Sequence, residues 1–319
     1  MFRFVIFGGA GFIGRHLCKF LAEKHPGAEV HVVDLAIKNP DSLHHCVDIR
    51  SPINLDLPRG IPTVIYNLAA IHKTPGHPTQ DYFETNMRGA ENVCTFAEGI
   101  DAQTIVFTSS IAPYGASEDL KTEDFLPMPN TPYGISKLVA EQIHRTWQAR
   151  ALGRRLTILR PGIVFGQGEG GNYTRLAKAL RKGFFAYAGR RDTLKAGIYV
   201  KDLVRVMDLM SQAQNCPFQL YNCCFPKAPT IEKIVETMMQ VMGVRRFVPR
   251  IPARILKAGA KALGVLDSVG IGFHPERVTK LMISTNISGE KLQRDYPLQF
   301  DLKTALEDWW KDCGGKGLE

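Results

Sequence analysis

The chain has 319 residues, of which 45% are hydrophobic and 22% are charged, and its formal net charge is +9. This composition can bury one or two cores and argues against a disordered chain. The first residues lack the pattern of a secretory signal and no apolar run is long enough for a membrane span, so we expect a cytoplasmic protein. The seven cysteines include no Cys-x-x-Cys pair, which favours reduced thiols and no metal site.

The excess of basic residues is not accompanied by a recognisable nucleic-acid-binding motif. We therefore expect no nucleic-acid partner. Most of these residues should lie on solvated faces, and a few could meet the phosphates of a ligand.

The first half of the chain alternates strands with helices. Apolar runs predict strands at 3–7, 29–33, 63–68, 104–109 and 156–160. Periodic stretches predict helices at 12–24, 81–98 and 133–151. This alternation is typical of an α/β fold with a parallel sheet covered by helices on both faces.

The first strand leads into Gly8, Gly11 and Gly14, and the second strand ends in Asp34, 20 residues beyond the last glycine. Glycines at such a turn let the backbone approach a diphosphate at the helix N-terminus, and the acid can bind ribose hydroxyls. The order predicts dinucleotide binding; the alternative is a tight structural turn. Asp34 favours NAD over NADP because a carboxylate repels a 2′-phosphate.

Tyr133 and Lys137 are four residues apart on one predicted helix, which Thr131 can cap. An ammonium beside a phenol favours the phenolate, so this spacing can produce a proton-transfer group for an alcohol or a ketone. Ser110 follows a central strand and could bond the same substrate oxygen. The alternatives are an exposed helix face for the pair and strand-end capping for Ser109 and Ser110.

From Phe165 onwards the pattern changes. A glycine-rich loop at 166–171 precedes elements at 173–182 (helix), 198–200 (strand), 202–213 (helix), 218–222 (strand) and 230–242 (helix). The tail from 245 is predicted to be largely helical, ending in an amphipathic segment at 302–310. We expect a dinucleotide domain, 1–165 rejoined by 194–228, and a smaller substrate domain, 166–193 and 229–319, with the active site in the cleft between them.

These motifs together resemble the extended short-chain dehydrogenases/reductases, in particular the NAD-dependent epimerase/dehydratase family acting on nucleotide sugars. The resemblance covers nearly the whole chain and is densest before Asp202. Besides the residues above, it rests on the segments 47–49, 66–70, 86–92, 114–115, 159–162 and 199–203. It implies a Rossmann-type doubly wound sheet, bound NAD, a nucleoside-diphosphate sugar as substrate, and a homodimer formed through the helices at 81–98 and 133–151.

The resemblance also implies roles for individual residues. Tyr133 would be the general acid/base, Lys137 would bind the nicotinamide ribose and lower the pKa of Tyr133, and Ser110 would orient the reacting oxygen. The implied cofactor contacts, in addition to Tyr133 and Lys137, are Gly8, Gly11, Phe12, Ile13, Gly14, Asp34, Asp48, Ile49, Leu68, Ala69, Ala70, Asn86, Ser109, Pro161 and Val164. The implied substrate contacts are His72, Lys73, Ser110, Asn172, Lys195 and Arg277.

Several of these residues have a second interpretation. Asp48 could be an ordinary turn aspartate, and the role of Asn86 is partly structural. Asn67 departs from the family, which often has histidine there. The loop with His72 and Lys73 and the basic residues of the second half could simply be solvated.

Residues near Ser110 narrow the reaction. In the related dehydratases and decarboxylases acids follow this position, whereas here Ile111 and Ala112 do. Hydride chemistry remains: epimerisation, which we expect at C4 of a UDP-hexose or a similar sugar nucleotide, or one-way reduction of a 4-keto sugar. A sterol-type dehydrogenase of the same superfamily is a further alternative, since the amphipathic tail could contact lipid. The intact Ser-Tyr-Lys set argues against a redox sensor.

Overall fold

The computed structural model describes residues 2–37, 41, 43–73, 76–115, 117–214, 216–254 and 282–319. The chain divides into two compact units. Unit 1 comprises Met1–Gly115, Glu123–Pro161 and Val200–Cys223, and unit 2 comprises Ala116–Thr122, Gly162–Tyr199 and Cys224–Glu319. These bounds differ by a few residues from the expected domain boundaries, and the segment 116–122 was not expected in the second unit.

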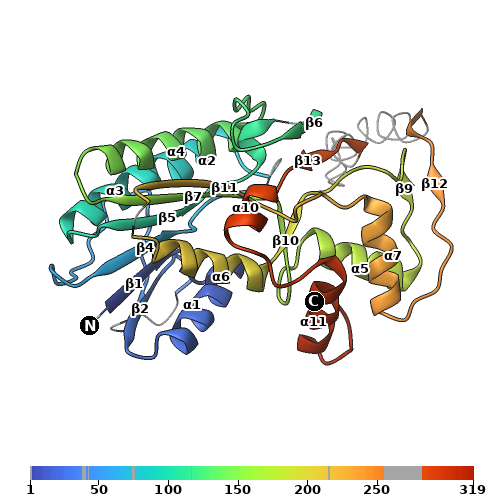
Figure 1. Cartoon of the computed structure of the whole chain (residues 1–319), viewed down its shortest axis with the longest axis horizontal. Coiled ribbons are helices and arrows are strands. Elements are labelled where there is room, and N and C mark those ends of the chain that lie inside the picture. Colours follow the sequence, from blue (N-terminus) through green and yellow to red (C-terminus); the bar gives the residue numbers. More distant parts are fainter. Residues whose placement is uncertain are drawn as a thin grey trace. The chain divides into compact units, whose positions relative to one another are not determined.

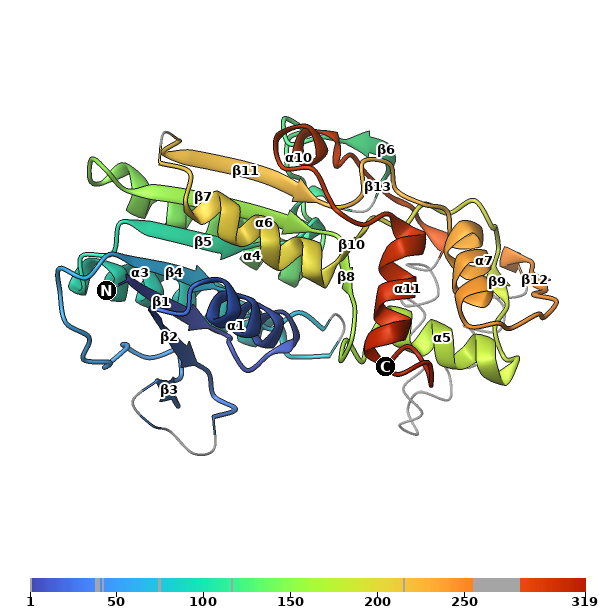
Figure 2. The ribbon, with the colours of Figure 1, turned by 60° about the horizontal axis from the view of Figure 1, so that its bottom comes forward.

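Unit 1 is built on a sheet of seven parallel strands (Figures 1 and 2). Their order is β11 (Phe218–Cys223), β7 (Arg155–Pro161), β5 (Thr104–Thr108), β4 (Thr63–Asn67), β1 (Phe2–Phe7), β2 (Ala28–Val33) and β3 (His44–His45). The predicted Rossmann-type sheet is confirmed. The chain order reverses between β1 and β4, which is where such sheets bind ligands at the carboxyl ends of their strands.

Helices cover both faces of this sheet. In both views α1 (Phe12–Lys24) and α6 (Val200–Ser211) lie together on one face, and α3 (Gly89–Gly99) and α4 (Pro132–Ala149) lie on the other. Thr131 caps α4, since its Oγ1 accepts a hydrogen bond from the Gly134 amide at 3.1 Å. The central strands β4 and β5 are buried along their whole length, so each reads as one apolar run in the sequence.

The helix expected at 81–98 is not uniform. A short helix α2 (Thr79–Tyr82) passes into a π-helical turn η1 (Phe83–Arg88) and only then into α3. Gly89 follows the π turn, and a Cβ there would clash with the Ile49 side chain. A π turn inserts an extra residue into a helix and often occurs at functional sites.

Unit 2 contains the helices α5 (Asn172–Lys182), α7 (Ile231–Val241), α10 (Glu290–Asp295) and α11 (Leu302–Asp312). Its described residues also form three parallel strand pairs: β8 (Ile163–Phe165) with β10 (Gly197–Tyr199), β9 (Tyr187–Ala188) with β12 (Arg250–Ile251), and β6 (Ser117–Lys121) with β13 (Thr285–Ile287). The prediction of a largely helical tail is therefore wrong at β12 and β13. Both strands pair with segments far away in the sequence, which a local pattern cannot reveal.

The core of unit 2 is aromatic. Phe165 stacks on Tyr173 with ring centroids 4.4 Å apart, and Tyr199 and Trp309 pack around the same ring. Asp301 caps α11 in a reciprocal capping box with Thr304. Among the described residues no helix is long and apolar enough to cross a membrane.

Candidate active site

The glycine turn lies at the carboxyl end of β1, beside the end of β4. Gly8 has a φ of 78°, and a Cβ on it would lie 2.7 Å from the Ala69 amide nitrogen. A Cβ on Gly14 would lie 2.6 Å from the Gly9 Cα. The turn therefore has no room for side chains at these glycines, and its backbone is uncovered next to α1. The first turn of α1 has no side-chain cap and no acidic residue. Such a helix start attracts a diphosphate. Phe12 and Ile13 are its first two residues.

Asp34 follows β2 and is tied to the glycine turn. Its Oδ2 accepts a hydrogen bond from the Ala10 amide at 3.1 Å, and its Oδ1 accepts one from the Ala36 amide at 3.0 Å. The carboxylate is therefore held beside the turn, where it can accept from ribose hydroxyls.

Asp48 and Ile49 have clear structural roles. Both Asp48 carboxylate oxygens bond the Arg50 guanidinium, with Oδ2 2.6 Å from Nη2, and this lowers the pKa of Asp48. The Arg50 amide also donates to Asp48 Oδ1, which is the bonding of an ordinary turn aspartate, the second interpretation of Asp48. The Ile49 side chain is buried in the core, and the Ile49 carbonyl accepts from Asn92 at 2.7 Å. Adenine contacts from this pair stay a prediction.

Asn86 joins the loop after β4 to the helix that carries the catalytic candidates. It is buried; its Oδ1 accepts from the Ile71 amide at 3.0 Å, and its Nδ2 donates to the Ile71 carbonyl and to Ser136. The Ser136 hydroxyl in turn donates to the Tyr133 carbonyl at 2.9 Å. Asn86 thus fixes both the path after Leu68, Ala69 and Ala70 and the start of α4.

The segments that carry Ser110 and Tyr133 pack together, since a Cβ on Gly134 would lie 2.7 Å from the Ala112 carbonyl oxygen. Burial raises the pKa of Tyr133, and the nearby Ser110 hydroxyl opposes this shift. Ser110 Oγ also accepts from the Ala112 amide at 3.1 Å, which fixes the serine side chain. The two hydroxyls can therefore hold one substrate oxygen between them.

Lys137 is on the inner face of α4 and is only 1% exposed. Its Nζ donates to the Thr108 carbonyl at 2.7 Å and lies 4.3 Å from the centroid of the Phe107 ring. Burial lowers the pKa of Lys137 to about 7, against the attraction of Glu141. The Lys137 ammonium is turned to the Thr108 carbonyl, and its expected lowering of the pKa of Tyr133 stays a prediction.

A buried ionic network lies behind these residues. Glu141 Oε1 accepts from the Ser109 hydroxyl at 2.5 Å and from Arg160 Nε at 2.9 Å, and its Oε2 accepts from Arg160 Nη2 at 2.6 Å. The Arg160 guanidinium lies 4.7 Å from the centroid of the Tyr114 ring. The Ser109 hydroxyl is therefore bonded within the protein, to Glu141, and its expected contact with the cofactor stays a prediction.

His144, one turn further along α4, is a neutral core residue. It is fully buried and stacked on Phe107, and burial lowers its pKa to about 4. One ring nitrogen bonds the Ala140 carbonyl, and the other lies 3.2 Å from Asn67 Nδ2. Asn67, which departs from the family pattern, is thus paired with His144 of α4 on this face of the sheet.

The loop after Ala70 is exposed at His72 and Lys73. Partial burial lowers the pKa of His72, as do the charges of Lys73, His77 and Lys137. The Lys73 carbonyl accepts a short hydrogen bond from Tyr82, which holds this side of the loop.

The other predicted contacts are dispersed. Pro161 ends β7, where its carbonyl accepts from the Ile111 amide at 3.2 Å, and Val164 is part-buried on β8. Asn172 is exposed at the start of α5 and bonds Arg175. Arg277 lies outside the described residues.

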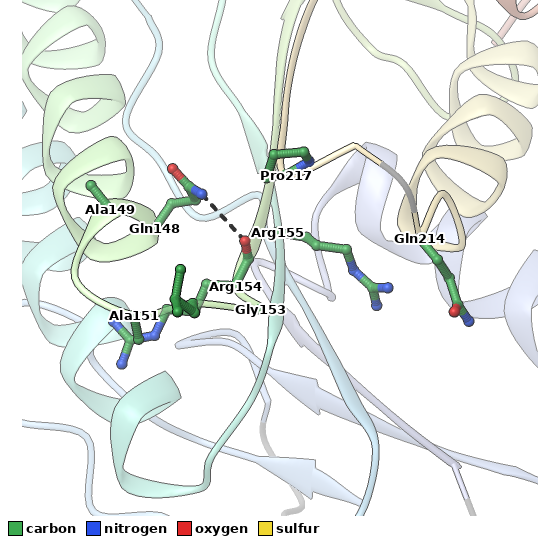
Figure 3. A pocket seen from close by; sticks show the side chains of 9 residues that line it. Gln148, Ala149, Ala151, Gly153, Arg154, Arg155, Gln214 and Pro217 are labelled. Carbon is green, nitrogen blue, oxygen red and sulfur yellow. Dashed lines mark hydrogen bonds between the residues drawn. The ribbon is translucent and has the colours of Figure 1, made fainter.

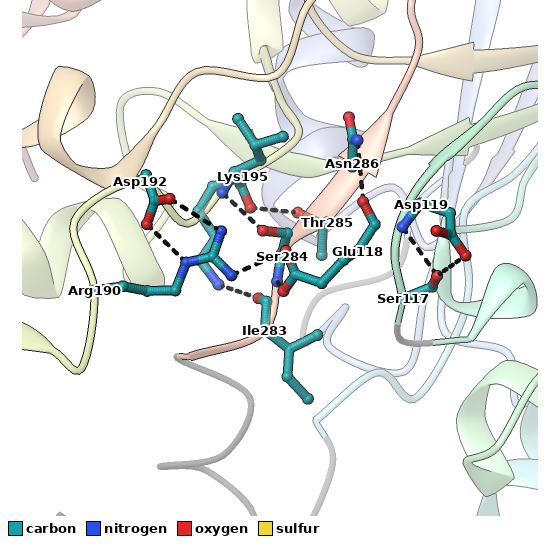
Figure 4. Close-up of polar contacts among 11 residues, drawn as sticks. Ser117, Glu118, Asp119, Arg190, Asp192, Lys195, Ile283, Ser284, Thr285 and Asn286 are labelled. Atoms are coloured by element: carbon teal, nitrogen blue, oxygen red, sulfur yellow. Dashed lines mark hydrogen bonds and ion pairs between the residues drawn. The ribbon is translucent and has the colours of Figure 1, made fainter. Parts of the chain in front are cut away.

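Lys195 belongs to a polar cluster in unit 2 (Figure 4). Its Nζ donates to the Ile283 carbonyl at 2.8 Å, and burial lowers its pKa to about 8. Nearby, Arg190 bonds Glu118 and Asp192, and Glu118 accepts from the Ser284 amide. The amine is thus engaged with the protein, and its contact with a substrate phosphate stays a prediction.

A surface hollow of about 420 Å³ lies at the opposite ends of the strands (Figure 3). Arg155 and Pro217, which line it, are at the amino ends of β7 and β11. Gln148 bonds the Arg154 carbonyl across its wall at 3.3 Å. None of the predicted site residues lines this hollow.

Comparison with known proteins decides the family. Residues 4–224 match the family described as NAD dependent epimerase/dehydratase. This chain is a member of that family. The expected enzyme class and the NAD cofactor are thereby confirmed.

Two curated relatives and one solved structure illustrate the range of this epimerase/dehydratase family. The chain is 31% identical to an N-acetyl-alpha-D-glucosaminyl-diphospho-ditrans,octacis-undecaprenol 4-epimerase of Escherichia coli O157:H7, over 83% of this chain and 80% of the relative. It is 26% identical to a GDP-6-deoxy-D-mannose reductase of Pseudomonas aeruginosa, over 80% and 85%. Its fold resembles that of UDP-glucuronic acid 4-epimerase from Bacillus cereus in complex with NAD, with a TM-score of 0.74, 21% identity and coverage of 97% and 95%.

The residues of unit 1 fit the NAD of this family. The glycine turn excludes side chains at Gly8 and Gly14, the first turn of α1 is open to a diphosphate, and the Asp34 carboxylate stands beside it. The sequence interpretation missed Glu141 and Arg160. A signal existed, because Glu141 is four residues after Lys137 and an acid on the inner face of a helix needs a partner.

Proposed function

We propose that the chain is an NAD-dependent 4-epimerase of a hexose linked to a diphosphate, with a UDP-hexose or a similar sugar nucleotide as the first candidate substrate. The observation that carries this proposal is that Tyr133 and Lys137 lie one turn apart on α4, with Lys137 Nζ bonded to the Thr108 carbonyl two residues before Ser110. It is supported by the glycine turn and by relatives named as 4-epimerases.

In this proposal Tyr133 takes the proton of the C4 hydroxyl while Ser110 holds the same oxygen. NAD held at the glycine turn and Asp34 would supply a reversible hydride acceptor for C4. The keto sugar turns in the site between these events, and Tyr133 gives the proton back when C4 is reduced from its other face. The substrate loses and regains one proton and one hydride, so no net oxidation occurs.

Lys137 holds the ribose of the cofactor in place and supplies a positive charge to the site. Its ammonium is anchored on the Thr108 carbonyl, directly before Ser109 and Ser110, so the lysine and the serine are positioned by the same strand end. Because burial brings the pKa of Lys137 to about 7, its charge depends on pH in the neutral range.

Elimination of water is disfavoured because no acid follows Ser110. Ile111 and Ala112 begin a 3-10 turn, Ala112–Tyr114, instead of presenting carboxylates. One-way reduction of a keto sugar uses the same three residues, and one relative is named as such a reductase. The test below separates it from epimerisation.

A second candidate substrate is an N-acetylhexosamine carried on a polyprenyl diphosphate. It is supported by the name of the relative that shares 31% identity over most of both chains. Both candidates present a diphospho-hexose to the same catalytic residues, and they differ in what lies beyond the diphosphate.

We also propose that the protein works in the cytoplasm as a homodimer through α3 and α4, which light scattering of the purified protein would test.

The test is incubation with catalytic NAD and, in turn, UDP-glucose, UDP-N-acetylglucosamine and N-acetylglucosaminyl-diphospho-undecaprenol. Proton NMR of the released sugars should show a C4 epimer of at least one of them, without accumulation of NADH. A product formed only in step with oxidation of added NADH would make the chain a ketoreductase. No conversion of any of the three would reject the proposal.

A further inference from the structure

Two exposed phenylalanines occupy neighbouring loops of unit 2. Phe184, directly after α5, is 85% exposed, and Phe247, after α7, is 87% exposed. Of the described large apolar side chains only Leu152, in unit 1, is as open to solvent. Exposing a full aromatic ring to water is unfavourable, so such pairs mark interaction surfaces.

The two loops are held side by side. Arg246 Nη2 donates to the Arg181 carbonyl at 3.0 Å, which joins the residue before Phe247 to the end of α5. A few residues on, the Tyr187 amide donates to the Pro249 carbonyl at 2.9 Å, and β9 pairs with β12. Figures 1 and 2 both show α5, α7, β9 and β12 gathered in this part of unit 2.

The surroundings of the rings are strongly basic. Residues 171–191 contain six Lys or Arg and no Asp or Glu, and residues 241–254 contain four Arg and no Asp or Glu. Lys182, Arg245 and Arg250 are exposed, and no carboxylate of the described residues forms an ion pair with them. We call Lys182, Phe184, Arg245, Phe247 and Arg250 the aromatic-basic edge.

We propose that the aromatic-basic edge docks the protein on an anionic lipid surface. Unpaired Lys and Arg are attracted to anionic headgroups, and two rings without polar atoms can enter the boundary between headgroups and acyl chains. The basic side chains would also attract a nucleic acid. Single-stranded nucleic acid, however, binds along a continuous groove lined by stacking aromatic side chains, and two phenylalanines on separate loops do not form such a groove. The proposal concerns a surface outside the catalytic residues, so it stands or falls independently of the substrate assigned above.

The test is flotation of the full-length protein with vesicles of phosphatidylcholine alone or of an equimolar mixture with phosphatidylglycerol. We expect binding to the anionic vesicles only, weakened by salt because exposed charges are screened. Lys182→Gln with Arg245→Gln should lower partitioning about thirty-fold, since each charge near an anionic surface contributes about five-fold. Phe184→Ser with Phe247→Ser should lower it at least about ten-fold.

Matched controls remove the same kinds of side chain elsewhere. Leu152→Ser and the pair Lys19→Gln with Lys24→Gln change exposed residues of unit 1 and should bind vesicles like the unmodified protein. All variants should keep the melting temperature of the unmodified protein, which shows that they fold. The proposal is overturned if anionic vesicles are not bound, if the edge variants bind as well as the controls, or if the edge binds a DNA or RNA duplex more tightly than the vesicles.

Discussion

The proposed catalytic residues of unit 1 and the predicted substrate lysine of unit 2 are held in different ways. Lys137 and its neighbour Glu141 are buried on one helix face and bond strand ends of the central sheet. Lys195 is part-buried in a cluster whose partners come from the separate segments 117–118 and 283–286. Chemistry common to a family needs fixed geometry, which a regular sheet provides, whereas recognition of one substrate can be built from irregular segments.

The largest expected effect tests the unit 1 side of this comparison. Tyr133→Phe should lower turnover by about 10²–10⁴-fold, the usual contribution of a general acid/base, while thermal stability and NAD binding stay close to those of the unmodified protein. Steady-state rates on the identified substrate measure it. Tyr173→Phe is the matched control, because its buried hydroxyl has no hydrogen-bond partner and its loss should not slow the reaction. Turnover of Tyr133→Phe within a few-fold of the control would remove Tyr133 from the mechanism.

The next effect concerns the buried ion pair. Glu141→Ala should lower the free energy of unfolding by about 3–5 kcal/mol, because it leaves Arg160 charged and unpaired in the core. The exposed pair of unit 2 provides the contrast: Glu232→Ala, which removes the partner of Arg191, should cost at most about 1 kcal/mol. Urea unfolding of both variants measures the difference. Equal costs would mean that the two units are not held as differently as their burial indicates.

A smaller effect should follow pH. The ordinary pKa of lysine is near 10.5, and burial lowers that of Lys137 to about 7, so folding disfavours its charged form. The resulting penalty is fully present below pH 7 and disappears as the pH rises towards 10.5. Relative to Lys137→Met, the protein without added NAD should therefore gain about 3.5 kcal/mol of stability between pH 7 and pH 10.

Thermal unfolding of the two proteins across this range measures the gain, with Lys19→Met as the exposed control that should show none. A difference that stays constant with pH would show that Lys137 remains charged in the folded protein over the whole range.

The smallest effect tests the unit 2 side. If the Lys195 ammonium also meets the substrate diphosphate, Lys195→Gln should raise the KM for a UDP-sugar by about three- to ten-fold and leave the affinity for NAD unchanged. Lys233→Gln, an exposed lysine of α7, is the matched control. A lower melting temperature with an unchanged KM would instead assign Lys195 to the stability of the contact with Ile283.

Local spacing explains why much of unit 1 could be predicted. The glycine turn, Asp34 and the Tyr133–Lys137 pair are each set by a few consecutive residues, and buried parallel strands read as apolar runs. The Glu141–Arg160 pair could not be predicted in the same way, since its members are 19 residues apart and meet only when α4 packs on β7. The same applies to β6 and β13, which are more than 160 residues apart, and to the π turn before Gly89, where packing against Ile49 outweighs a regular helical pattern.

In the proposed reaction, one site oxidises C4 and reduces it again with the same cofactor molecule. It is tested most directly with a substrate that carries deuterium at C4, incubated with the protein, catalytic NAD and an excess of unlabelled NADH. The hydride that leaves C4 should return to C4, so the epimer should retain the deuterium in full, as read by NMR and mass spectrometry. Loss of deuterium from the product in proportion to the added NADH would contradict the account and indicate a reductase that exchanges its cofactor.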